Sequence, residues 1–229
     1  MADLRQQKAA QLRALIRPLE QARYEVDTHF NFVERMLETL DKDYGGLELI
    51  PDYQRGHVWS PEQQVHFIEN VMRGAVATSG LTIQFNCPNF ERRAVSPERD
   101  LPVGIQCVDG LQRLTAVRRF MADELRPFGL ALNDLRGTEY DPTRMTFRLR
   151  IAVFNFERKV ELLDHYLALN AGGTPHAESE IARVRAMRDA LADDATAKLW
   201  TRKWDETMRD ISHSDQAQAA PAGHGRRSA

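Results

Sequence analysis

Residues 102–125 read PVGIQCVDGLQRLTAVRRFMADEL and combine an apolar segment, a tight turn and an amphipathic segment. The first part, 102–108, is mostly apolar and ends at the turn dipeptide Asp109-Gly110, which is a strong signal for a change of direction. Beyond the turn, apolar residues recur at helical spacing as Leu114, Val117, Met121 and Leu125. The pattern therefore predicts a buried strand that turns sharply into a helix packed on the same core.

Shorter strands and several helices are expected on either side of this unit. Hydrophobic periodicity predicts strands over residues 47–50, 81–85 and 145–154, and helices over residues 4–20, 30–40, 60–73 and 157–170, with a last helix beginning near 178. Ser60-Pro61 supplies an N-cap followed by proline at the first helical position. The polar segment 86–101 is expected to form a long surface loop. Because the strands alternate irregularly with more abundant helices, the fold class is predicted to be α+β.

We divide the chain into four parts by composition and periodicity. An N-terminal helix is expected within 1–25 and a mixed domain within 26–175. A helical extension is expected within 176–211, and a disordered tail within 212–229. Trp200 and Trp204 lie one helical turn apart in the extension, which favours a core or interface role over base stacking.

Composition limits the classes of function. The 229 residues are 42% hydrophobic and carry a formal net charge of -2, which argues against a broadly basic coat for binding nucleic acid. The two cysteines, Cys87 and Cys107, suit neither a zinc knuckle nor a disulfide framework. The charged N-terminus lacks the apolar core of a signal peptide, and no apolar run is long enough to cross a bilayer. We expect a cytoplasmic protein without a membrane partner.

Two segments could carry chemistry. At the start of the helix after Asp109-Gly110, backbone N–H groups without helical partners and the helix dipole favour an anion. Arg113 could reach the same anion, and Asp109 could hold a divalent cation. The other segment, IPDYQRGHVW over residues 50–59, offers Arg55 as a planar fork for phosphate or carboxylate. Structural alternatives stay open, with Asp109 as a helix N-cap, Arg113 as a surface charge, Arg55 paired with a nearby acid, and His57 as a turn residue.

Together, IPDYQRGHVW and VDGLQRLTAV resemble the N-terminal domain family of GmrSD-type restriction systems. Members carry an IPxYQRxxxW segment and a DGQQRLT segment on a ParB/sulfiredoxin-like fold, a small mixed sheet with flanking helices. A third resemblance lies in residues 167–174 and 178–181, where a helix ends in Asn170 before a Gly-Thr turn and an acidic helix start. The matching positions are Pro51, Tyr53, Gln54, Arg55, Trp59, Asp109, Gly110, Gln112, Arg113 and Thr115.

The resemblance implies a cytoplasmic nucleotide-binding domain that hydrolyses ATP or GTP with Mg²⁺ in a restriction system. Asp109, Gln112 and Arg113 are then the expected catalytic residues, with Asp109 as the metal ligand. The expected nucleotide-binding residues are Tyr53, Gln54, Arg55, Gly110 and Thr115. Leu111 departs from the family pattern, since it replaces the first glutamine of DGQQR and cannot position a water, although this position could also face the core.

A C-terminal nuclease domain of the His-Asn-His type is not expected in this chain, so either the chain works as a lone NTPase or binding domain or a separate nuclease subunit supplies cutting; a homodimer is the other expected assembly. The alternative function is a catalytically weak ParB-like module that binds DNA or protein. In that case a local basic patch would contact DNA, and its candidates are Arg92, Arg93, Arg99, Arg118 and Arg119. A solvated helix face is the simpler role for these arginines.

Overall fold

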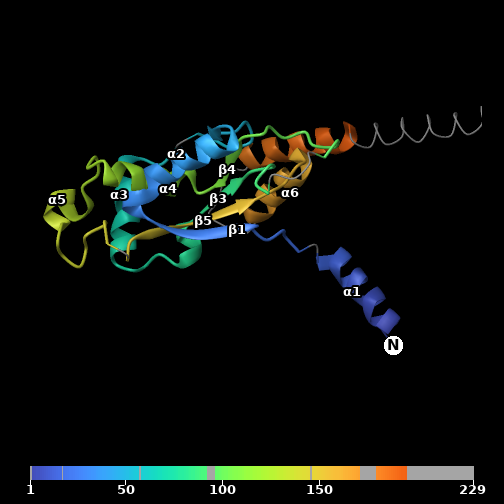
Figure 1. Ribbon diagram of the computed structural model, residues 1–229, viewed down its shortest axis with the longest axis horizontal. Coiled ribbons are helices and arrows are strands. Elements are labelled where there is room, and N and C mark those ends of the chain that lie inside the picture. The colour runs from blue at the N-terminus through green and yellow to red at the C-terminus, as the bar shows by residue number, and fades with distance from the viewer. Residues whose placement is uncertain are drawn as a thin grey trace, which may run out of the picture.

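The computed structural model describes residues 2–16, 18–56, 58–91, 96–144, 146–170 and 179–194. Predictions about His57, Arg92, Arg93, Trp200, Trp204 and the tail lie outside these residues. The described chain forms a five-stranded mixed sheet with helices packed against it (Figure 1). This arrangement confirms the predicted α+β class, while the four domain boundaries remain predictions.

The sheet has the strand order β1-β5-β3-β4-β2. Its strands are β1 (Tyr24–His29), β2 (Leu47–Glu48), β3 (Thr82–Asn86), β4 (Ile105–Asp109) and β5 (Arg148–Phe154). The central β3 pairs parallel with β5 and antiparallel with β4, and β1 pairs antiparallel with β5 at one edge. At the other edge, β2 pairs with only two residues of β4, Ile105 and Gln106. The rest of β4 on that side is therefore left for other partners.

Helices follow the strands closely. The α-helices are α1 (Ala2–Ile16), α2 (Val33–Tyr44), α3 (Pro61–Met72), α4 (Leu111–Met121), α5 (Leu132–Leu135) and α6 (Lys159–Asn170), and another helix covers 179–194. Short 3₁₀ helices are η1 (Phe30–Phe32), η2 (Thr78–Leu81) and η3 (Pro127–Gly129). None of the helices in the described ranges is both long enough and apolar enough to span a membrane.

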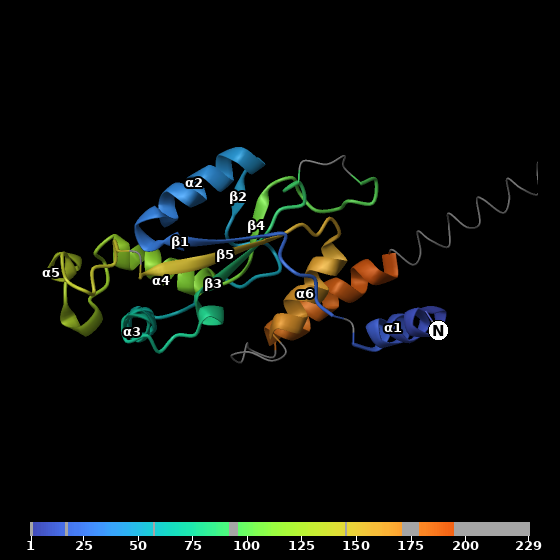
Figure 2. The same ribbon diagram turned by 60° about the horizontal axis from the view of Figure 1, so that its bottom comes forward.

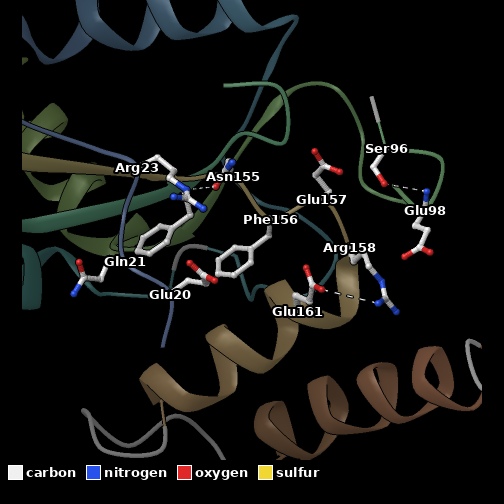
Figure 3. A pocket seen from close by; sticks show the side chains of 11 residues that line it. Glu20, Gln21, Arg23, Ser96, Glu98, Asn155, Phe156, Glu157, Arg158 and Glu161 are labelled. Carbon is white, nitrogen blue, oxygen red and sulfur yellow. Dashed lines mark hydrogen bonds and ion pairs between the residues drawn. The ribbon is translucent and has the colours of Figure 1, made fainter. Parts of the chain in front are cut away.

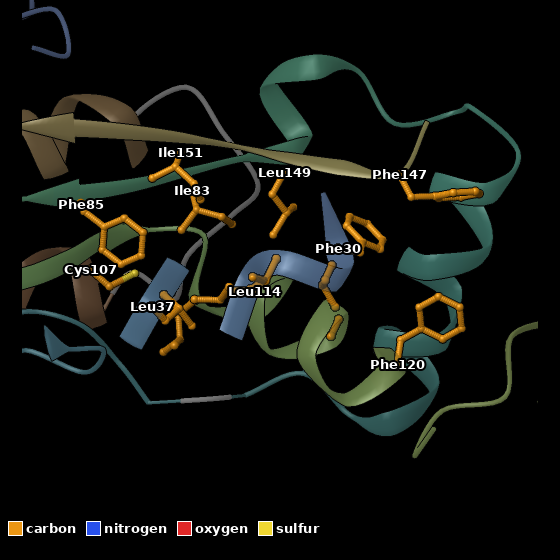
Figure 4. Close-up of a cluster of buried hydrophobic side chains, with 14 of the residues drawn as sticks. Phe30, Leu37, Ile83, Phe85, Cys107, Leu114, Phe120, Phe147, Leu149 and Ile151 are labelled. Carbon is orange, nitrogen blue, oxygen red and sulfur yellow. The ribbon is translucent and has the colours of Figure 1, made fainter. Parts of the chain in front are cut away.

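Two hydrophobic clusters lie on opposite faces of the sheet. In β5, Ile151 and Val153 join the larger cluster, which α2 and α4 complete with Leu37 and Leu114 (Figure 4). The alternate residues of β5, such as Ala152, join the smaller cluster with side chains of α6 and of the helix over 179–194. Because strand side chains alternate between faces, a strand buried on both sides needs such a nearly continuous apolar run.

Most predicted elements are confirmed, but three regions differ. β1 was not predicted, although Tyr24, Val26 and Thr28 alternate with more polar residues; the segment is short, and its order comes from pairing with β5. The helix α1 forms as predicted, yet it lies apart from the sheet, and Leu15 is 79% exposed (Figures 1 and 2). The predicted surface loop begins with a buried residue, Asn86, whose amide exchanges hydrogen bonds of 3.1 Å and 2.8 Å with the backbone of Phe156.

Gly110 makes the sharp turn from β4 into α4 possible. Its φ of 97° lies in the left-handed region, where only glycine is unstrained. A Cβ atom at this position would lie 2.7 Å from Ile83 Cδ1 and 3.1 Å from Ile83 Cα. The turn therefore needs glycine both for its backbone angle and for the close approach of β3.

Replacing Gly110 with alanine should lower the free energy of unfolding by about 2–4 kcal/mol, as left-handed strain adds to overpacking. Gly137→Ala is a matched control, because Gly137 also has a positive φ of 75° but no atom within 4 Å of the added Cβ. The control should lose only about 1–2 kcal/mol. Urea denaturation of both variants measures the difference, and equal losses would refute the steric part of this account.

Candidate functional site

A cavity of about 490 Å³ lies where β4 runs into α4. Its wall combines residues from both sequence segments with residues of β3, η2 and α6. The lining residues are Gln54, Arg55, Trp59, Ser79, Gly80, Gln84, Asp109, Gly110, Leu111, Gln112, Arg113, Tyr166, Leu169 and Asn170. The structure thus brings together, around one hollow, two motifs that lie some 50 residues apart in the sequence.

Asp109 and Arg113 form an ion pair at this cavity. Asp109 is the last residue of β4, and Arg113 lies one helical turn further on, in α4. Arg113 Nη2 donates to the Asp109 carboxylate, while Nη1 donates to the Ser79 carbonyl at 3.3 Å. The N-cap of α4 is Gly110, so the alternative of Asp109 as N-cap is wrong. The pair holds a partly buried guanidinium next to the open end of the helix.

Arg55 forms the second ion pair of the cavity. Its Nε lies 3.3 Å from a carboxylate oxygen of Glu180, in the helix over 179–194, and the Glu180 side chain is only 6% exposed. The Tyr166 hydroxyl donates to the same carboxylate at 3.0 Å. Burial and the neighbouring Glu180 raise the pKa of Tyr166, so this phenol stays protonated at neutral pH. The C-terminal helix thereby holds Arg55 at the rim.

Gln112 ties the two motifs together through the backbone. Its Oε1 accepts hydrogen bonds from the N–H groups of Val58 and Trp59 at 3.0 Å and 3.1 Å. Its Nε2 donates to the Gly56 carbonyl at 3.2 Å. Three of the four hydrogen bonds that a glutamine amide can make are therefore used inside the protein. Gln112 lines the cavity, and these bonds position the first motif against α4, while its expected catalytic role stays a prediction.

Gln54 and Tyr53, in the first motif, donate side-chain hydrogen bonds to the backbone just before the second motif. Gln54 Nε2 donates to the Cys107 carbonyl at 2.6 Å, and the Tyr53 hydroxyl donates to the same oxygen at 3.4 Å. Because β2 stops pairing after Gln106, these side chains replace the missing strand partner of Cys107. Burial raises the pKa of the Cys107 thiol to about 12, which agrees with its prediction as a core residue.

Two predicted residues, Tyr53 and Thr115, do not line the cavity, and Leu111 lines it without a polar group. Tyr53 is fully buried in the smaller core cluster and does not line the cavity, and its contact with nucleotide stays a prediction. The Thr115 hydroxyl donates to the Leu111 carbonyl at 2.8 Å, and Thr115 also lies outside the lining. Leu111 is 6% exposed and packs in the larger core cluster, which supports the expectation that this position faces the core.

Sequence reasoning missed four residues around the cavity. Gln84 lies on β3 opposite Asp109, and Ser79 supplies the carbonyl that holds Arg113. Tyr166 and Glu180 come from two helices that precede and follow residues 171–178. Gln84 lies between the apolar residues Ile83 and Phe85, and this alternation indicates only that Gln84 faces the side of the sheet opposite to theirs. No local pattern distinguishes Gln84, Ser79 or Tyr166 from ordinary positions, whereas Glu180 lies within the acidic helix start over 178–181.

Two other features of the described chain do not form a competing site. Arg118 pairs with Glu34, and Arg119 pairs with Glu124, so neither contributes an unpaired charge to a basic patch. Among the described residues, no three His, Cys, Asp or Glu side chains gather closely enough to hold a metal ion.

A second cavity of about 490 Å³ lies between the start of β1, the end of β5 and the loop over 96–98, and glutamates, arginines and neutral residues line it together (Figure 3). Burial, together with neighbouring carboxylates that include Glu20 and Glu157, raises the pKa of Glu161 in its wall. This cavity contains neither motif, so we place the candidate site at α4.

If Gln112 ties the motifs together, Gln112→Ala should release the backbone of residues 56–59. Amide hydrogen exchange of Val58 and Trp59 should become at least about tenfold faster, because each N–H group loses its hydrogen bond to Gln112 Oε1. The Ile68 amide, inside α3, is an internal control and should keep its rate. Unchanged exchange at Val58 and Trp59 would show that the tie does not order this segment.

Comparison with known proteins identifies the family. The model of the family described as "GmrSD restriction endonuclease, N-terminal domain" matches residues 34–216, which is most of the 229-residue chain. No curated protein and no solved structure matched the chain, so the expected kinship with ParB and sulfiredoxin folds stays a prediction. The matched range includes both motifs and every residue that lines the cavity. The chain therefore belongs to the family of GmrSD restriction endonuclease N-terminal domains.

Proposed function

We propose that the cavity at the start of α4 binds a nucleoside triphosphate, ATP or GTP, and hydrolyses it within a restriction system. The observation that carries this proposal is the convergence of Arg55, Arg113 and the N-terminus of α4 on one cavity. A cavity of about 490 Å³ falls within the usual range for small-molecule sites. Family membership supports the proposal, because the motifs that supply these residues are the ones by which the chain resembles the family.

The phosphates would lie at the N-terminus of α4. The first-turn N–H groups of a helix have no partner within the helix, and its dipole favours an anion. Gly110 has no side chain to block approach to them. A guanidinium has five N–H donors, so an arginine that is paired with one carboxylate can still donate to phosphate. Arg113 and Arg55 can therefore bind the anion without losing their ion pairs.

Magnesium fits the site through Asp109. Mg²⁺ in nucleotide sites is commonly held by one or two carboxylates, together with phosphate oxygens and water, so it does not need a cluster of protein ligands. Asp109 is half-exposed at the cavity and would be that ligand. When bound, the ion would neutralise phosphate charge. The protein's own residues would supply the rest: the arginines stabilise negative charge, and Gln112 and Gln54 keep both motifs in register.

Calorimetric titration with non-hydrolysable analogues of ATP and GTP, in the presence of Mg²⁺, tests binding. Wild type should bind at least one analogue, and Arg113→Ala should weaken its affinity by about 10- to 100-fold through loss of a charge-assisted contact. Arg118→Ala is a matched control, since Arg118 lies on the same helix and pairs with Glu34 away from the cavity. Equal affinity of wild type and Arg113→Ala would remove Arg113 from the site.

Hydrolysis is tested by phosphate release from ATP and GTP, with and without DNA. Asp109→Asn should reduce release at least about tenfold, because it removes the carboxylate that would hold Mg²⁺ and that fixes Arg113. If wild type releases no phosphate and binds no nucleotide, yet shifts DNA with a steep salt dependence, the alternative of a DNA-binding module replaces this proposal.

A further inference from the structure

Gln84, on β3, is the register partner of Asp109 on the neighbouring strand β4, and both residues line the same cavity. The pairs Gln84–Asp109 and Phe85–Cys107 are one residue apart along β3 but two residues apart along β4. This irregularity is a β-bulge, a feature that redirects side chains and is common beside active sites. It places a neutral amide side chain next to the carboxylate of the second motif.

A buried histidine bonds the oxygen end of this amide. His165, in α6, is 4% exposed, and its ring lies against Phe154 and Phe156 at centroid distances of 4.5 Å and 5.1 Å. His165 Nε2 is 3.2 Å from Gln84 Oε1. Its other ring nitrogen, Nδ1, is buried and has no hydrogen-bond partner among the described residues.

The unpartnered Nδ1 determines which way the amide points. Burial lowers the pKa of His165, so the ring is neutral at pH 7 and carries one N–H. A buried N–H without an acceptor is rarer and costlier than a buried lone pair without a donor. The proton therefore belongs on Nε2, which donates to Gln84 Oε1. This bond fixes the oxygen end of the amide toward His165, and the Gln84 amide nitrogen remains as the group that can donate to a ligand.

We propose that Gln84 is a phosphate-binding residue of the cavity, and that His165 positions it so that its amide nitrogen donates to a phosphate oxygen. This inference rests on the proposed nucleotide site and adds a donor that neither motif contains. His165 acts through Gln84 and is a positioning residue. With His165 bonded to its oxygen, the amide can turn its N–H donors toward the cavity, which suits an anionic group.

Calorimetric titration of the full chain with inorganic tripolyphosphate and with a non-hydrolysable ATP analogue tests this role. Gln84→Glu keeps the side-chain shape and the acceptor for His165, but it replaces the donor with a negative charge. It should weaken both affinities at least about tenfold, through loss of the donor and repulsion of the anion. Gln63→Glu is the matched control, since it makes the same change in the exposed capping box of α3 and should change affinity less than about twofold.

Two more variants separate positioning from folding. Gln84→Met removes the donor without adding charge and should weaken tripolyphosphate binding about five- to tenfold. His165→Phe should weaken tripolyphosphate binding less than Gln84→Met does. The double variant should bind tripolyphosphate no more weakly than Gln84→Met alone, since both changes affect the same contact. Melting temperatures confirm that each variant is folded. Additive losses in the double variant would overturn the positioning role of His165.

The outcomes distinguish this inference from the proposed function. If wild type binds the analogue and both Gln84 variants bind it equally well, Gln84 is not a phosphate ligand and the nucleotide site stands without it. If wild type binds neither tripolyphosphate nor the analogue, the nucleotide site and the role of Gln84 both fall.

Discussion

Three hydrogen bonds from one side chain, Gln112, hold the site in its shape. They fasten the first turn of α4 to the backbone of Gly56, Val58 and Trp59, described residues that belong to no strand or helix. Gln54 and Tyr53 add two hydrogen bonds from the first motif to the Cys107 carbonyl, near the end of β4. Removing one of these side chains would lower the free energy of unfolding, because it leaves its buried hydrogen-bond partners unsatisfied. The two motifs thus form one unit, and Arg55 keeps its place relative to α4 because of it.

The charges around the cavity balance, and this explains how a chain with a net charge of -2 can contain an anion site. Arg113 pairs with Asp109, and Arg55 pairs with the buried Glu180. Each carboxylate fixes its guanidinium in place, so less side-chain entropy would be lost when phosphate binds. Because Glu180 comes from the helix over 179–194, the position of Arg55 also depends on how that helix docks. Arg183 of the same helix donates to the carbonyls of Asp52 and Tyr53, which strengthens that docking.

Local patterns in the sequence predicted the elements that depend on local physics. The strand, turn and helix over 105–121 follow from apolar periodicity and from Asp109-Gly110, and α3 follows from the capping box that begins at Ser60. β1 was missed because its order comes from pairing with β5, more than 100 residues later in the chain. The motifs identified the cavity, but they did not show that Gln112 and Tyr53 face the protein. An amide or a phenol has the same chemistry toward backbone and ligand, so only the three-dimensional structure separates the roles. Gln84 and His165 had no local signal, since tertiary packing alone brings them to the site, whereas Glu180 lies in the acidic helix start that resembles the family.

A crystal structure of the chain with a non-hydrolysable triphosphate analogue and Mg²⁺ would test the central claim most directly. The account predicts that the phosphates lie at the N-terminus of α4, within hydrogen-bond distance of the Arg113 guanidinium and the first-turn amides. It also predicts that Gln112 keeps its bonds to residues 56–59. Phosphates bound elsewhere, for example beside Glu20 and Glu161, or an α4 cavity filled only by water at saturating analogue, would contradict it.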